Sequence, residues 1–155
     1  MKRVIAITLI LTAVLSGFSR VCAEERVFVL CNPESFVIVH RNPKMTSEKA
    51  GRLECGEYAL TDGKKKNGFL HILNVTEYGE GWIYTGYVVH DQPTIRDAVA
   101  CVAASGKVRA RRCINGQRIA WLKVGTEIKV YAMSEEWAVT DRGFVNREYL
   151  EVWYE

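Results

Sequence analysis

Hydrophobic and polar residues alternate in short runs along most of the chain, and Gly, Asn and Pro separate the runs. Alternation with a period of two predicts β-strands. The runs are rich in β-branched and aromatic residues and cover 27–31, 36–39, 53–60 and 69–75. Asn32-Pro33 and Asn42-Pro43 predict turns between them. Residues 61–68, which include three lysines, are expected to form a hairpin loop. We therefore predict an all-β fold.

The same order of short segments occurs twice in the sequence. One copy contains VIVHRNP, GRLECG, NGFLHIL and GEGWIYTGYVV, and the other contains VRARRCI, AWLKVG, EEWAVT and DRGFVNREYL. The corresponding residues are Val37 and Val108, Leu53 and Leu122, Gly56 and Gly125, Phe69 and Trp137, Gly81 and Gly143, Trp82 and Phe144, and Tyr87 and Tyr149. The Phe69–Gly81 hairpin is longer than the Trp137–Gly143 hairpin, and insertions at hairpin tips cost little. The repeat predicts two copies of one small module, each with its own core.

The N-terminus has the pattern of a secretion signal. Lys2 and Arg3 precede an apolar run, Val4 to Leu15, and a cut is expected after Ala23. The run is too short to suit an uncut membrane anchor. We predict a signal peptide at 1–23, a first module at 24–90, a linker at 91–98 and a second module at 99–155. A helical turn over 94–102 is the alternative to an extended entry into the second module. The mature protein is expected to be secreted or associated with the cell envelope, with no membrane span.

Removal of the signal changes the charge balance. The full chain has 21 Lys and Arg residues against 18 Asp and Glu residues, but Lys2, Arg3 and Arg20 all lie in the signal. The mature chain is therefore close to neutral. A global basic field of the kind that attracts nucleic acid is absent, so no nucleic-acid partner is expected.

Four cysteines follow the signal, two in each copy: Cys31, Cys55, Cys101 and Cys113. An exported protein tolerates disulfides, and small modules often need them. Of the three possible pairings, we favour Cys31 with Cys55 and Cys101 with Cys113, because each bond then closes a loop within one copy. A zinc site is the alternative, but the Cys-x-x-Cys spacing typical of zinc is missing. No metal or cofactor is expected.

The repeated order resembles the bacterial Src-homology-3-like domain, a module common in exported and cell-wall-associated proteins. Both copies follow its order of an Arg-containing strand, a Leu-x-x-Gly step, an aromatic-led strand and a final Gly-aromatic segment ending near Tyr. Phe69 stands where the family usually has Trp, and the second copy lacks the usual Pro. The resemblance implies two tandem small SH3-like β-barrels that bind ligands and lack catalytic activity.

One basic stretch is free of acidic residues and contains Lys107, Arg109, Arg111, Arg112 and Arg118. Alternation places Arg109 and Arg111 on one outward face, with Val108 and Ala110 turned to the core. The simplest interpretation is a solvated strand face. The functional interpretation is an edge where Arg109, Arg111 and Arg112 contact wall phosphates, peptide carboxylates or an acidic partner.

Several aromatic residues lie beside turns or at strand starts, and core packing is their alternative role. Those expected to line a ligand groove are Tyr78, Tyr84, Tyr131 and Trp137. No catalytic residues are predicted, because His40, His71 and His90 lack the partners that a Cys/His hydrolase needs. The leading hypothesis is therefore an exported binding module for cell-wall peptide or glycan, or for an envelope protein. A stand-alone interaction or inhibitor protein is the alternative, and a peptidoglycan-modifying enzyme is a distant third.

Overall fold

The computed structural model describes residues 24–75 and 79–153. The predicted signal peptide, 1–23, lies outside the described residues, as does Tyr78. The described chain folds into two antiparallel sheets of seven strands each, so the all-β prediction is confirmed. Among these residues, no helix is long and apolar enough to cross a bilayer.

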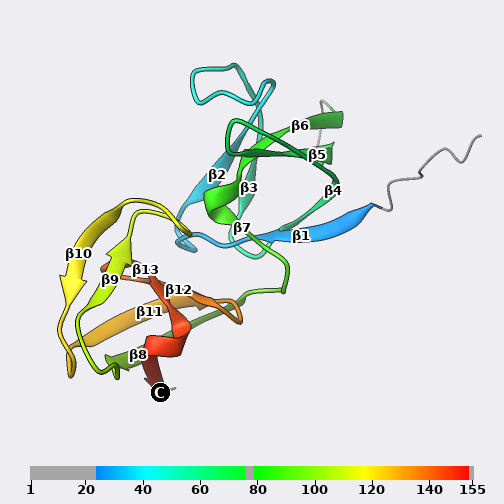
Figure 1. The fold of residues 1–155 in the computed structure, drawn as a ribbon. Coiled ribbons are helices and arrows are strands. Elements are labelled where there is room, and N and C mark those ends of the chain that lie inside the picture. Colours follow the sequence, from blue (N-terminus) through cyan, green and yellow to red (C-terminus); the bar gives the residue numbers. More distant parts are fainter. Residues whose placement is uncertain (1–23, 76–78, 154–155) are drawn as a thin grey trace, which may run out of the picture.

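The first sheet contains strands β1 to β7 and forms the first half of the molecule (Figure 1). Its strands run in the order β3-β2-β6-β5-β4-β1-β7. The bounds are β1 Glu25–Val29, β2 Phe36–His40, β3 Lys49–Glu54, β4 Tyr58–Lys66, β5 Phe69–Val75, β6 Gly79–Tyr84 and β7 Val88–Val89. A short 3-10 helix, η2 (Thr85–Tyr87), lies between β6 and β7.

The second sheet repeats this arrangement in the order β10-β9-β13-β12-β11-β8-β14 and forms the second half. The bounds are β8 Thr94–Val102, β9 Val108–Arg111, β10 Arg118–Leu122, β11 Glu127–Met133, β12 Trp137–Thr140, β13 Gly143–Asn146 and β14 Leu150–Trp153, with the 3-10 helix η3 (Arg147–Tyr149) before β14. Adding seven to each strand number of the first sheet gives the order of the second. In the described chain, no strand pairing joins the two edge strands of either sheet, so closure into barrels stays a prediction.

Main-chain hydrogen bonds repeat at equivalent positions. Gly56 N donates to Val29 O at 2.8 Å, and Gly125 N donates to Val102 O at 2.9 Å. The two glycines have φ of 82° and 79°, a left-handed conformation that glycine adopts without strain. This agreement supports the predicted correspondence of Gly56 with Gly125.

Three local predictions need correction. The run at 53–60 is not one strand, because β3 ends at Glu54 and β4 begins at Tyr58, with a turn at Cys55 and Gly56 between them. β8 begins at Thr94, so residues 94–98 belong to the second sheet and not to a linker. Antiparallel pairing with β11 fixes this segment as a strand, which excludes the helical turn. The expected loop at 61–68 is also shorter, because β4 continues to Lys66, which pairs with Phe69. Asn67 and Gly68 form the turn, with φ of 52° and 79°, and a two-residue turn of this kind favours Asn-Gly.

The hydrophobic cores also differ from the expectation of one separate core per half. One cluster lies within the second half, around Val102, Val130 and Val145. The other cluster fills the first half and includes four residues of the second half: Ala132, Trp137, Val139 and Phe144. Tyr87 packs edge-on against Phe144, with ring centroids 5.8 Å apart. The two halves therefore share apolar packing where they meet.

Candidate functional site

Two surface grooves occupy equivalent positions in the repeat. Each lies beside the segment that follows the first strand of its half, and the main chain fixes this segment in the same way. Leu30 N donates to Tyr87 O, and Ala103 N donates to Tyr149 O, both at 2.9 Å. Tyr87 is the last residue of the 3-10 helix η2 and lines the first groove. Tyr149 is the last residue of the 3-10 helix η3 and lines the second groove. The two halves of the repeat therefore carry equivalent grooves.

The second half covers part of the first groove. This groove has a volume of about 610 Å³ and is lined in the first half by Cys31, Asn32, Ser35, Phe36, Val37, Ile38, His40, Met45, Tyr84 and Tyr87. The second half adds Arg112, Val139, Thr140, Gly143 and Phe144 to its wall. Ile114 N also donates to Gly86 O at 2.9 Å across the boundary. The second half therefore fills part of the space that a ligand would need in the first groove.

The second groove, of about 560 Å³, is lined by residues of the second half alone: Ala104, Ser105, Gly106, Lys107, Val108, Arg109, Arg111, Asn115, Trp121, Trp137, Asn146 and Tyr149. The predicted alternation on β9 is confirmed, because Val108 and Ala110 are buried while Arg109 is exposed. Arg111 is half-buried, and its Nη1 donates to Gly116 O at 2.8 Å. Arg109 therefore presents its charge to the groove, while Arg111 also supports the β9–β10 turn.

Two guanidinium groups lie close to the indole ring of Trp121. Cζ of Arg109 is 5.4 Å from its ring centroid and Cζ of Arg118 is 4.7 Å from it. Trp121 is 45% exposed, so the ring stays available to a ligand. Cation–π contact orders long arginine side chains without neutralising them. Trp121 therefore gives the second groove an exposed aromatic surface, and Arg109, which lines the same groove, gives it positive charge.

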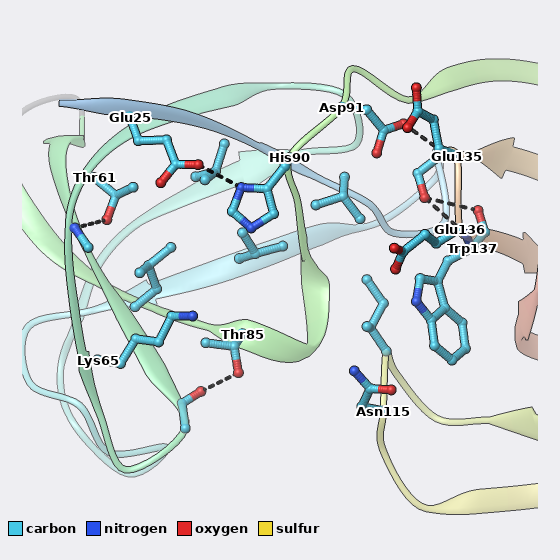
Figure 2. A pocket seen from close by; sticks show the side chains of 18 residues that line it. Glu25, Thr61, Lys65, Thr85, His90, Asp91, Asn115, Glu135, Glu136 and Trp137 are labelled. Atoms are coloured by element: carbon cyan, nitrogen blue, oxygen red, sulfur yellow. Dashed lines mark hydrogen bonds and ion pairs between the residues drawn. The ribbon is translucent and has the colours of Figure 1, made fainter. Parts of the chain in front are cut away.

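A larger hollow of about 780 Å³, the junction cleft, lies between the two halves (Figure 2). Val27, Leu70, Val89 and Ile114 supply apolar surface. Its polar side chains are Glu25, Thr61, Lys65, Thr85, His90, Asp91, Asn115, Ser134, Glu135 and Glu136. His90 Nδ1 lies 2.9 Å from Glu25 Oε1 on the wall of the first half. Carboxylates outnumber cations in this cleft, in contrast to the second groove.

The predicted ligand residues are not all brought together. Arg109, Arg111 and Trp137 line the second groove, whereas Arg112 and Tyr84 line the first groove. Tyr131 is half-buried and packs against the shared cluster of apolar residues. Trp137 also belongs to that cluster, so its role combines core packing with lining of a groove. The sequence prediction did not select Trp121 or Tyr149 as ligand residues.

The four cysteines are free thiols in the structure. Cys31 and Cys55 are buried and hydrogen-bonded to each other, and this bond lowers the pKa of the Cys55 thiol to about 7 and raises that of Cys31. Cys113 lies against the first half, and a Cβ added at Gly86 would sit 2.8 Å from its Sγ. Cys101 lies on β8, opposite Glu127 and Glu151. The contacts therefore favour the first predicted pair and give no support to pairing Cys101 with Cys113.

Oxidised glutathione should join Cys31 to Cys55, because the Cys55 thiolate attacks the glutathione disulfide and the neighbouring Cys31 then displaces the second glutathione as a thiol. The bond would stabilise the fold by about 3 kcal/mol through restriction of the unfolded chain. Peptide mapping of the non-reduced protein should recover the Cys31–Cys55 link and an unlinked Cys113. Urea unfolding should show a stability loss on reduction that the Cys31→Ser/Cys55→Ser variant lacks and Cys101→Ser retains. A bond from Cys31 to any other cysteine would contradict this assignment.

His71 on β5 is buried and contacts Trp82 with ring centroids 4.9 Å apart. Its Nδ1 lies 3.1 Å from Asp62 Oδ1, without the geometry of a hydrogen bond, and its Nε2 lies 3.4 Å from Glu80 Oε2. Hydrogen bonding from Lys64 lowers the pKa of Asp62 to about 2, and His71 contributes to the shift. His71 therefore sits between two carboxylates on the first sheet, apart from the second groove.

No family model and no curated protein matches the chain. Two solved structures are similar to it at low identity. NlpC1 from Trichomonas vaginalis is 12% identical with a TM-score of 0.36, and the match covers 94% of this chain and 50% of that one. NlpC2 from Trichomonas vaginalis is 11% identical with a TM-score of 0.35, and the match covers 83% of this chain and 48% of that one. The chain thus spans about half the length of these proteins.

Proposed function

We propose that the protein is an exported, non-enzymatic binding module for cell-wall peptide or glycan, or for an envelope protein, and that the second groove holds the ligand. The observation that carries this proposal is the exposed indole of Trp121 in the second groove, with the guanidinium groups of Arg109 and Arg118 close to its ring. An aromatic face accepts a sugar ring or an extended peptide, and arginine pairs with carboxylate or phosphate. These are the chemical groups that wall polymers present.

The equivalence of the two grooves supports the choice of the second. The second half already occupies part of the wall of the first groove, through Phe144 and Arg112. The second groove is lined by its own half alone and carries Lys107, Arg109 and Arg111. One repeat position thus serves contact between the halves, and its counterpart is free for a ligand.

Changing Arg109→Glu together with Trp121→Ala should weaken binding to purified peptidoglycan by about 10-fold to 100-fold. This range corresponds to loss of one charge-assisted contact and one stacking surface. Both side chains are exposed, so the variant should fold normally. Co-sedimentation of the secreted protein with insoluble peptidoglycan at low salt measures the effect.

The first half offers a matched control. Arg52 Cζ lies 5.2 Å from the ring centroid of Phe36, an exposed arginine–aromatic pair like that in the second groove. Arg52→Glu with Phe36→Ala changes charge and aromatic content in the same way and should leave wall binding unchanged. Equal losses of peptidoglycan binding in the two variants would show that the second groove is not the ligand site. Unchanged wall affinity combined with lost capture of one extracellular protein would favour the alternative, an interaction or inhibitor protein.

A further inference from the structure

The second groove and the junction cleft meet at the same two residues. Asn115 and Trp137 line both hollows. Asn115 lies in the β9–β10 turn with φ of 54°, and Trp137 begins β12. A ligand that fills the second groove can therefore continue past these residues into the cleft.

The two hollows carry opposite charge on either side of Trp137. The second groove presents Lys107, Arg109 and Arg111. The wall of the cleft next to Trp137 presents the adjacent Glu135 and Glu136. Both glutamates are exposed, and within the described part of the chain neither carboxylate forms an ion pair. Lys65 lies on the opposite wall, in the first half (Figure 2).

Asp91 fixes the acidic turn in place. Its Oδ2 accepts a hydrogen bond from Glu135 N at 2.7 Å, which links the connecting segment to the β11–β12 turn. Arg147 N donates to Glu136 O at 2.8 Å from the other side. The main chain of this turn is therefore held at two points, which fixes where the side chains of Glu135 and Glu136 begin.

Trp137 supplies a hydrogen-bond donor between the two charged regions. The residue is only 7% exposed, and its main-chain groups bond to Ser134, with N donating to Oγ at 3.0 Å and O accepting from N at 2.8 Å. Its indole Nε1 has no hydrogen-bond partner among the described residues, and Figure 2 shows this nitrogen on the side of the ring that faces the cleft. This nitrogen is not among the buried unpaired polar atoms of the described residues, so it is reachable from the cleft, where a ligand oxygen can accept its hydrogen bond.

We propose that the groove and the cleft together bind one peptide with a free carboxylate at one end and a free amine at the other. The carboxylate contacts Arg109, the amine contacts Glu135 and Glu136, and an amide carbonyl between them accepts from Trp137 Nε1. A glycan chain without amines would satisfy the groove but not the acidic turn. This inference rests on the proposed binding function and narrows its ligand to a zwitterionic peptide.

Stem peptides released from purified cell wall serve as the probe, in three forms: native, acetylated at the free amine, and amidated at the carboxylates. Calorimetric titration of the secreted protein measures each affinity. Acetylation and amidation should each weaken binding about 10-fold, the effect of losing one charge-assisted contact. Glu135→Gln with Glu136→Gln should weaken the native peptide by a similar factor and leave the acetylated peptide unchanged. Arg109→Gln should likewise affect the native form and not the amidated form.

The outcomes separate this inference from the proposed function. If the native peptide binds and depends on Arg109, but acetylation and the glutamate changes have no effect, then the two-ended ligand is wrong and the second groove stands. If acetylation weakens the wild type and the Glu135→Gln/Glu136→Gln variant equally, the amine binds elsewhere and the inference also fails. If none of the three peptide forms binds, the assignment of a wall peptide as the ligand fails together with the inference.

Discussion

Replacing Phe144 by alanine should lower the free energy of unfolding by about 3–5 kcal/mol, the usual cost of removing a buried phenylalanine ring. Phe144 is 5% exposed and packs against Tyr87 of the first half. Because it belongs to the cluster that fills the first half, its loss should weaken the second half and its contact with the first. Urea unfolding measures the loss, and limited proteolysis should show cleavage in both halves.

Phe36→Ala provides the comparison for Phe144→Ala. Phe36 is 48% exposed on β2, so its truncation should change the stability by less than about 1 kcal/mol. A stability loss for Phe144→Ala as small as that for Phe36→Ala would mean that the two halves do not share a core. Normal resistance of the first half to protease in the Phe144→Ala variant would lead to the same conclusion.

Gly143→Ala should destabilise the protein by about 3–5 kcal/mol, from backbone strain and overpacking together. Gly143 has φ of 108°, which L-residues rarely adopt, and an added Cβ would lie 2.5 Å from Arg111 O. That oxygen is main chain of β9, and Arg111 pairs with Phe144 and Arg118, so it cannot move freely. Ile119 Cδ1 would also lie 2.8 Å from the new methyl group. Thermal unfolding measures the effect.

Gly106→Ala is the matched control for Gly143→Ala. Gly106 lies in the segment between β8 and β9, and an added Cβ would have no neighbour within 4 Å. This substitution should change the stability by less than about 0.5 kcal/mol. Similar unfolding temperatures for the two variants would show that β13 does not approach β9 as closely as the structure places it.

The internal repeat predicted that both halves contain the same segments in the same order along the chain, because hydrophobic alternation and Gly positions are local properties. Gly56 and Gly125 correspond in sequence and take the same conformation with the same hydrogen bond. The way in which the halves meet is not a local property. Trp82 and Phe144 correspond in the repeat, yet Trp82 lies half-buried against His71 while Phe144 is buried against Tyr87. Equivalent sequence positions thus took different roles once one half packed on the other.

The candidate site was predictable only where it follows from strand alternation. The outward direction of Arg109 follows from the period of β9. Selection of Trp121 requires the register between β9 and β10, in which Arg109 and Trp121 are direct partners. Single-sequence patterns do not give that register. The same limit explains Cys113, which was expected to face its own half and instead lies at the boundary, beside Gly86.

The most direct test records backbone and indole chemical shifts of the isotope-labelled protein while soluble wall fragments are added. Occupation of the second groove should shift the signals of Lys107, Arg109, Trp121 and Tyr149, and the indole N–H of Trp137. Signals of Phe36 and Tyr84 in the first groove should stay unchanged. Shifts confined to the first groove, or none anywhere at millimolar fragment, would contradict the assignment of the second groove as the ligand site.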